Sequence, residues 1–107
     1  MAKTFTDDNF DTDVIEASRK KPVLVDFYAS WCGPCMMQGP IVDKFAEEIG
    51  DKAHVGKLST EDSEFTAAKY GVMSIPTLIV FKDGDPVETM VGLQNADQLK
   101  AALDAHA

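Results

Sequence analysis

The two cysteines of this 107-residue chain are two residues apart in the segment Trp31-Cys32-Gly33-Pro34-Cys35, and this spacing constrains the fold more than any other feature. If Cys32 opens a helix, Cys35 lies one turn further on, about 5 to 5.5 Å away by Cα. That separation falls inside the range of about 4.4–6.8 Å that a disulfide requires. The pair can therefore form and break a disulfide with little movement of the backbone.

The residues on either side of this segment predict a strand followed by a helix. Residues 23–29 form a nearly continuous apolar run rich in β-formers, which is typical of a strand buried on both faces. Residues 34–49 have helical periodicity, with Pro40 inside the pattern. The cysteines therefore stand between the carboxyl end of a central strand and the start of a helix, where α/β folds commonly place their chemistry.

The remaining periodicities predict the element order βαβαβαββα and a mixed five-stranded sheet with helices on both faces. Asp83-Gly84 indicates a hairpin turn, and Asn95 with Gln98 indicates a capping box at the last helix. The other expected strands cover residues 3–5, 53–58, 77–81 and 87–91. The expected buried helix positions are Phe10, Val14 and Ala17, then Met37, Ile41, Phe45 and Ile49, then Phe65, Ala68 and Val72, and finally Ala96, Leu99 and Leu103.

Length and charge exclude several classes of function. We expect one domain over residues 1–107, because a chain of this length buries about 60–70% of its unfolded surface without metals or structural disulfides. We also expect a monomer. The net charge of −8 argues against nucleic acid and anionic membranes as partners. No apolar run approaches the ~20 residues of a membrane span, and the amino terminus has no hydrophobic signal core, which indicates the cytoplasm.

Two cysteines favour redox chemistry over a structural metal site. Zinc in a structural site needs four ligands, and the other candidates, His54 and His106, do not stand at a metal-site spacing from the cysteines. A purely structural disulfide across two residues would also be an unusual choice in a reducing cytoplasm. We therefore expect no metal and no other bound cofactor, and interpret the cysteines as a redox pair.

The run from Val25 to Cys35, VDFYASWCGPC, resembles the active-site segment of the thioredoxin family. Lys57, the segment Ile75-Pro76-Thr77 and Gly92 match further family positions, so the resemblance covers essentially the whole chain. It implies the thioredoxin fold and protein-disulfide reductase activity through a reversible Cys32–Cys35 disulfide. It also implies disulfide-containing proteins as substrates and a thioredoxin reductase that supplies reducing equivalents from NADPH.

Four residues are predicted to carry the chemistry. Cys32 is the expected nucleophile, because a thiolate at a helix amino terminus receives unpaired N–H groups and the positive end of the helix dipole. Cys35 is the expected resolving thiol. Asp26 is the candidate general base, although a structural aspartate with satisfied hydrogen bonds is the alternative. By resemblance, Lys57 on the adjacent strand pairs with or tunes this acid.

Ile75-Pro76 is the expected second half of the site. From the pattern alone, Pro76 could simply start a strand. The resemblance implies a cis proline facing the cysteines, preceded by backbone that binds an extended substrate in β fashion. We expect Trp31, Gly33 and Pro34 to support the active site. The predicted substrate-binding residues are Met73, Ser74, Ile75, Gly92 and Leu93.

Several positions depart from the commonest family pattern. Met36 and Met73 stand where cations are frequent, and Tyr28 stands where tryptophan is usual. We hypothesise that Met36, Met37 and Met73 make an apolar docking surface and that the Cys32 thiolate is less stabilised than in a lysine-bearing relative. The alternative is that Met37 belongs to the core and that the other two methionines are neutral changes.

The direction of electron flow follows from the residues between the cysteines. Relatives that oxidise or isomerise disulfides usually carry a histidine there, whereas this chain has Gly33-Pro34, which favours the reducing role. Two alternatives stay open: a dedicated redox partner of one target, and a binding module that uses the same surface as a subunit of a larger assembly.

Overall fold

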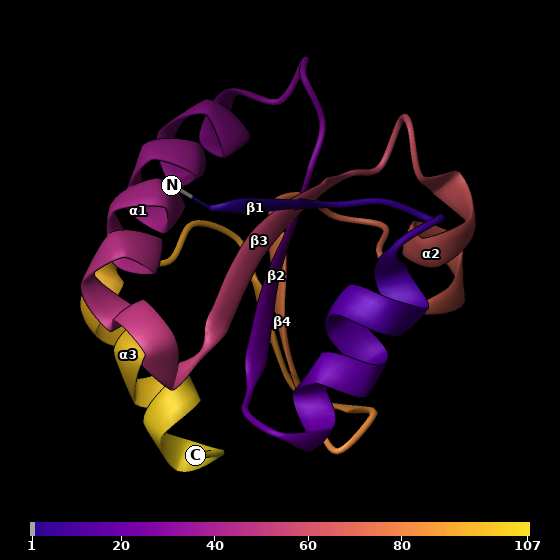
Figure 1. Cartoon of the computed structure of the whole chain (residues 1–107). Coiled ribbons are helices and arrows are strands. Elements are labelled where there is room, and N and C mark those ends of the chain that lie inside the picture. Colours follow the sequence, from indigo (N-terminus) through magenta and orange to yellow (C-terminus); the bar gives the residue numbers. More distant parts are fainter. Residues whose placement is uncertain (1) are drawn as a thin grey trace.

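The computed structural model describes residues 2–107, in which one mixed five-stranded sheet lies between two layers of helices (Figure 1). The strands lie in the order β1-β3-β2-β4-β5, with β1, β3 and β2 parallel and with β4 and β5 antiparallel to their neighbours. The strands are β1 (Lys3–Phe5), β2 (Val23–Tyr28), β3 (His54–Ser59), β4 (Thr77–Lys82) and β5 (Asp85–Val91). The fold class and the element order predicted from the sequence are confirmed.

Helices cover both faces of this sheet. In Figure 1, α1 and α3 lie on one side, and α2 lies on the other side with the helical segment that precedes β2. The α-helices are α1 (Gly33–Ile49), α2 (Glu64–Lys69) and α3 (Ala96–Ala105). The shorter helical segments are the π-helix η1 (Asp11–Glu16) and the 3-10 turns η2 (Ala17–Arg19) and η3 (Gly50–Lys52). The first predicted helix is therefore present, but it is not a regular α-helix.

The core consists of one apolar cluster on each face of the sheet. On the α1 and α3 face, Leu24 and Leu78 pack with Val42, Phe45 and Leu99. The other face buries the aromatic rings of Phe5, Phe10, Phe27 and Phe81. Because side chains alternate along β2, Asp26 shares its face with Leu24 and therefore points toward α1. This placement puts a carboxyl group inside the apolar layer that carries the cysteines.

Four expected core positions are wrong, because the helices are rotated differently from the predicted apolar stripes. In α1 the buried residues include Cys35 and Gln38, so Met37 is turned outward and is 62% exposed. In α2 the buried residues are Thr66, whose N–H and hydroxyl both donate to Asp7, and Ala67, while Phe65 and Ala68 are exposed. In α3, the buried residues are Leu99, Ala102 and Leu103, and the first residue, Ala96, is exposed.

Candidate active site

The cysteine pair lies at the start of α1, directly after β2. Cys32 is the N-cap residue with extended backbone, and Pro34 lies in the first turn, where its missing N–H removes no helical hydrogen bond. A disulfide joins Cys32 to Cys35, with their Cα atoms 5.2 Å apart. That distance agrees with the separation expected for residues one helical turn apart.

The backbone around the pair makes its polar contacts with one of the two sulfurs, Sγ of Cys32. The N–H of Cys35 donates a hydrogen bond to Sγ of Cys32 over 3.2 Å, which uses one of the unpaired donors of the helix start. Sγ of Cys32 also lies 3.7 Å from the carbonyl oxygen of Ile75. Both cysteines are buried to the same extent, so the hydrogen bond, and not exposure, distinguishes the two sulfurs.

A second loop completes the site from the far end of the chain. The Ile75–Pro76 peptide bond is cis, as the resemblance implies, and Ile75 packs against both cysteines. Gly92 donates its N–H to the carbonyl oxygen of Pro76 over 2.8 Å and has a φ of +92°, a conformation that favours glycine. The structure therefore brings the predicted residues Cys32, Ile75, Pro76 and Gly92 together.

Large apolar side chains on the segments that flank the pair are exposed. Trp31 is 74% exposed and Met73 is 94% exposed, while Met36 points to solvent from the first turn of α1. Leu93, next to Gly92, is also exposed, as is Ser74. These side chains are available to a partner protein, and Met37 is exposed with them and does not belong to the core.

Asp26 is fully buried, and within residues 2–107 neither of its carboxylate oxygens has a hydrogen-bond partner. Burial raises the pKa of Asp26 to about 7, while the charge of Lys57 lowers it in part and the charge of Asp43 raises it. A group with a pKa near neutrality can accept a proton and release it again at ambient pH, as a general base must. The alternative of a structural aspartate with satisfied hydrogen bonds does not fit this environment.

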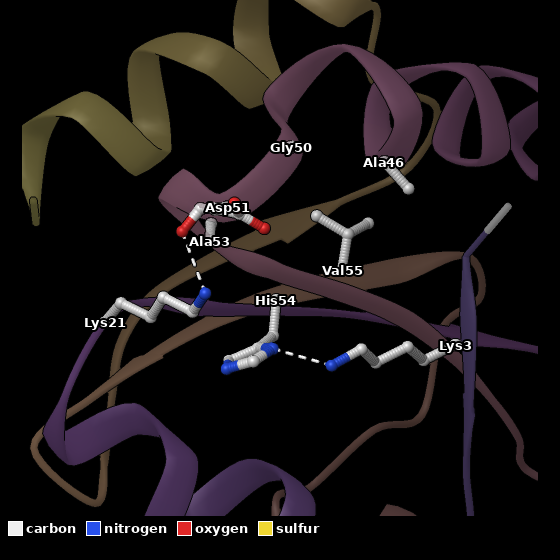
Figure 2. A pocket seen from close by; sticks show the side chains of 8 residues that line it. All are labelled: Lys3, Lys21, Ala46, Gly50, Asp51, Ala53, His54 and Val55. Carbon is white, nitrogen blue, oxygen red and sulfur yellow. Dashed lines mark hydrogen bonds between the residues drawn. The ribbon is translucent and has the colours of Figure 1, made fainter.

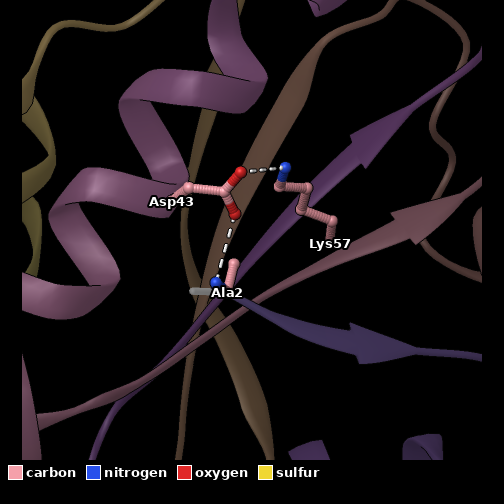
Figure 3. Close-up of polar contacts among 3 residues, drawn as sticks. All are labelled: Ala2, Asp43 and Lys57. Carbon is pink, nitrogen blue, oxygen red and sulfur yellow. Dashed lines mark hydrogen bonds and ion pairs between the residues drawn. The ribbon is translucent and has the colours of Figure 1, made fainter.

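Lys57 is the in-register neighbour of Asp26 on β3, but its side chain is bonded elsewhere. Its Nζ donates to Oδ2 of Asp43 over 2.9 Å, and the ion pair is shown in Figure 3. The structure thus places Lys57 close enough to act on Asp26 through its charge but not in a hydrogen bond with it. Asp43, on α1, is half-buried and part of this group.

A hollow of about 440 Å³ lies beside Cys35. It is lined by Tyr28, Ala29, Ser30, Cys35, Met36, Gly39 and Lys57. Space of this size with polar groups on its wall can hold water. Water there would contact Cys35 and Lys57, which neighbours Asp26.

Gln38 is a site residue that the sequence did not single out. Its side chain is fully buried, donates to the carbonyl oxygen of Gln94 over 3.0 Å and accepts from the Gln94 N–H over 2.7 Å. These two bonds join α1 to the segment that contains Gly92 and Leu93. The only sequence signal was a polar residue three positions after Cys35, on the buried side of the helix.

The histidines lie away from the cysteines. His54 pairs in register with Val23 at the start of β2, whereas the cysteines follow the opposite end of that strand. Figure 2 shows His54 beside Lys3, whose Nζ lies 2.7 Å from the imidazole Nδ1, and near Lys21. Burial lowers the pKa of His54, and the charges of the two lysines lower it further. His106 instead contacts Glu88.

Among residues 2–107, no group of three or more histidine, cysteine, aspartate or glutamate side chains is arranged to hold a metal ion. In the same part of the chain, no helix combines the length and apolarity needed to cross a membrane.

Comparison with known proteins places these features in one family. The family model described as "Thioredoxin" matches residues 1–105. The chain is 48% identical to the thioredoxin of Alicyclobacillus acidocaldarius subsp. acidocaldarius over 100 residues, which cover 94% of this chain and 92% of that protein. It is 45% identical to thioredoxin 1 of Synechococcus elongatus over 106 residues, which cover 99% and 97% of the two chains. The chain belongs to the thioredoxin family and is a thiol–disulfide oxidoreductase with protein-disulfide reductase activity.

Proposed function

We propose that Cys32 is the nucleophile of this reductase and that Cys35 resolves the intermediate. The thiolate of Cys32 attacks one sulfur of a substrate disulfide, forms a mixed disulfide and releases the other substrate sulfur as a thiolate. Cys35 then loses its proton, attacks Sγ of Cys32 and releases the second substrate sulfur. The substrate gains two electrons, and the protein is left with the Cys32–Cys35 disulfide. The assignment of Cys32 as the nucleophile rests on the hydrogen bond that its Sγ accepts from the Cys35 N–H.

We propose Asp26 as the base that accepts the Cys35 proton, with water in the adjoining hollow as the relay. Its isolation in the α1 face of the sheet supports this role, because a base is useful here only if its pKa lies near ambient pH. Lys57 tunes the acid by its charge. Stopped-flow measurement of mixed-disulfide resolution tests the role: Asp26→Ala is expected to slow this step by about 10²-fold. An unchanged rate would remove Asp26 from the mechanism.

The substrate segment is proposed to lie along the loop before Pro76. The carbonyl group of Ile75 faces the cysteines, and free backbone groups at such a position can pair with an extended peptide as an added strand does. Met73, Ser74, Gly92 and Leu93 would contact the flanking residues of the substrate. Trp31, Gly33 and Pro34 would support the first turn of α1. The exposed methionines would make this docking surface apolar and adaptable.

Members of this family need no bound cofactor, because the two cysteines carry the electrons. The family implies a reductase and disulfide-bonded proteins as partners. We propose that a thioredoxin reductase using NADPH returns the disulfide to the dithiol. We further propose a monomer folded as one domain over residues 1–107 and at work in the reducing cytoplasm. The absence of a histidine between the cysteines supports the reducing direction.

Reduction of insulin by dithiothreitol tests the function as a whole. Addition of the parent protein is expected to accelerate the reaction, and Cys32→Ser is expected to abolish the acceleration. If the protein instead served as a binding module, complexes with its partner would survive Cys32→Ser unchanged. Such complexes, together with no loss of insulin reduction, would contradict the proposal.

A further inference from the structure

The pairing of charges at the α1 face of the sheet is unexpected. Asp26 and Lys57 are in register on the parallel strands β2 and β3, so their side chains leave the sheet on the same face. Neighbouring strands lie about 4.8 Å apart, which is close enough for a lysine and an aspartate to form an ion pair. Lys57 nevertheless donates to Asp43, and both oxygens of Asp26 lack a hydrogen-bond partner in the described part of the chain.

Asp43 is held in place by contacts to β3 and to the residue that precedes β1. Oδ1 accepts from the N–H of Ala2 over 3.1 Å, and Oδ2 accepts from Lys57 over 2.9 Å (Figure 3). Burial would raise the pKa of Asp43, but the bonds from Lys57 and Ala2 outweigh burial and hold this pKa below its usual range. The carboxylate is therefore ionised at neutral pH and fixed in orientation.

Helix α1 also leaves room for the lysine that Asp43 binds. A Cβ atom at Gly39 would lie 3.4 Å from Nζ of Lys57, which is van der Waals contact, so the ammonium group lies directly against this part of the helix. Gly39 and Asp43 are one helical turn apart on the same side of α1. One residue accommodates the ammonium group and the other binds it.

From this geometry we infer that Asp43 is a positioning residue that sets the proton affinity of Asp26 by keeping the Lys57 ammonium group away from it. The inference rests on the proposed role of Asp26 as general base. Among the described residues, two charged groups act on Asp26: Lys57 from β3 and Asp43 from α1. From β4, the in-register neighbour is the uncharged Leu78.

Both effects of Asp43 act in the same direction. Asp43 keeps the Lys57 ammonium group away from Asp26, and its own carboxylate adds a negative charge nearby. Each effect favours the protonated form of Asp26 and so raises its pKa. With Lys57 released, Asp26 would stay ionised to lower pH and would be a weaker base for the Cys35 thiol. Asp43 thus keeps the base near the pH at which a thiol must be deprotonated.

The experiment follows the carboxyl carbon of Asp26 by NMR through a pH titration of the disulfide form. An opposite charge within ~4–6 Å lowers a carboxyl pKa by about 1–3 units, so Asp43→Asn is expected to lower the pKa of Asp26 from about 7 to about 6. Glu48→Gln is the matched control, because it removes one negative charge from an exposed position of the same helix. It should leave the Asp26 titration unchanged, and an unchanged titration in Asp43→Asn would overturn the inference.

A second pair of variants distinguishes the effect of Asp43 on the position of Lys57 from the effect of its own negative charge. In a Lys57→Met background there is no ammonium group to release, so the shift caused by Asp43→Asn should shrink to less than half. An equal shift in both backgrounds would show that Asp43 acts only by its own charge and would refute the positioning role. The pH midpoint of mixed-disulfide resolution should move with the Asp26 titration.

Failure of this inference can be told apart from failure of the proposed function. The titration of Asp26 reports the effect of Asp43 whether or not Asp26 acts as the base. The resolution rate of Asp26→Ala reports the role of the base whether or not Asp43 controls it. Suppose that Asp43→Asn shifts the pKa of Asp26 but Asp26→Ala resolves the mixed disulfide at the parental rate. The effect of Asp43 on Asp26 would then stand, and the proposed role of Asp26 as general base would fail.

Discussion

Cys35 donates its backbone N–H to Sγ of Cys32 over 3.2 Å, so the proposed resolving residue also contacts the sulfur of the proposed nucleophile. In the reduced protein the same donor is available to a thiolate at position 32, together with the positive end of the α1 dipole. Because these contributions come from the backbone, they do not depend on a charged side chain nearby. The exposed side chain that follows Cys35 is the uncharged Met36.

Met36→Lys is expected to increase the reactivity of Cys32. A cation on the first turn of α1 favours the thiolate, and an exposed charge of this kind should raise the rate of alkylation below neutral pH about twofold to threefold. The rate is measured with iodoacetamide in the reduced protein at several salt concentrations, since the gain should shrink as salt screens it. Ala101→Lys on the exposed face of α3 is the control. An unchanged alkylation rate in Met36→Lys would contradict the expectation that a cation at this position favours the Cys32 thiolate.

Asp26→Ala is expected to stabilise the protein in a pH-dependent way. Below about pH 4 the carboxyl is protonated in both the folded and unfolded states, so its ionisation costs no stability. Between about pH 4 and 7 the unfolded chain releases the proton while the folded protein keeps it, so stability is lost as the pH rises through the folded pKa of about 7. Above that pH the loss is constant at up to about 4 kcal/mol.

Urea unfolding of parent and variant at a series of pH values measures this difference. The free energy of unfolding of Asp26→Ala should exceed that of the parent by an amount that grows from about pH 4 to 7 and then levels off. A difference that does not vary with pH would mean that Asp26 has an ordinary pKa. The base proposed for Cys35 would then lack its physical basis.

Gln38→Leu is expected to loosen the loop that contains Gly92 and Leu93. The substitution keeps the side chain nearly the same size but removes both bonds to Gln94, and each unpaired backbone group should cost about 1 kcal/mol. The KM for insulin should rise because the loop is part of the proposed docking surface. Reduction of a small-molecule disulfide, which needs no such surface, should be unaffected. Equal losses with both substrates would point to damage at the cysteines.

The sequence predicted the sheet and the cysteine geometry because both depend on local patterns. An apolar run that ends in Cys-x-x-Cys specifies a buried strand, a helix start and a Cα separation, and the observed separation of 5.2 Å follows from helix geometry. Strand limits were right to within two residues, because apolar runs and the Asp83-Gly84 turn mark them directly.

The rotation of the helices could not be predicted in the same way. The spacing of Met37 from Ile41 fits a buried stripe, yet Cys35 and Gln38 are the residues of the first turns of α1 that are buried. In α2, a hydrogen bond from Thr66 to Asp7, 59 residues away in the sequence, outweighs the apolarity of Phe65. Contacts between residues so far apart in the chain carry no local signal.

The partner of Lys57 was missed for a related reason. Adjacent strands made Asp26 the obvious candidate, and the register of β2 and β3 supports that expectation. The choice of Asp43 depends on how closely α1 approaches β3, which Gly39 permits. A helical pattern can place Asp43 on the polar side of α1, but it cannot state what that side contacts.

The most direct test of the account is to trap the intermediate with a protein disulfide. Reduced Cys35→Ser and reduced Cys32→Ser are each mixed with insulin, and the products are separated without reductant and mapped by mass spectrometry. If Cys32 is the nucleophile and Cys35 the resolving thiol, Cys35→Ser accumulates a mixed disulfide through Cys32, while Cys32→Ser forms little or none. A mixed disulfide through Cys35 that forms as fast in Cys32→Ser would contradict the assignment of Cys32 as the nucleophile.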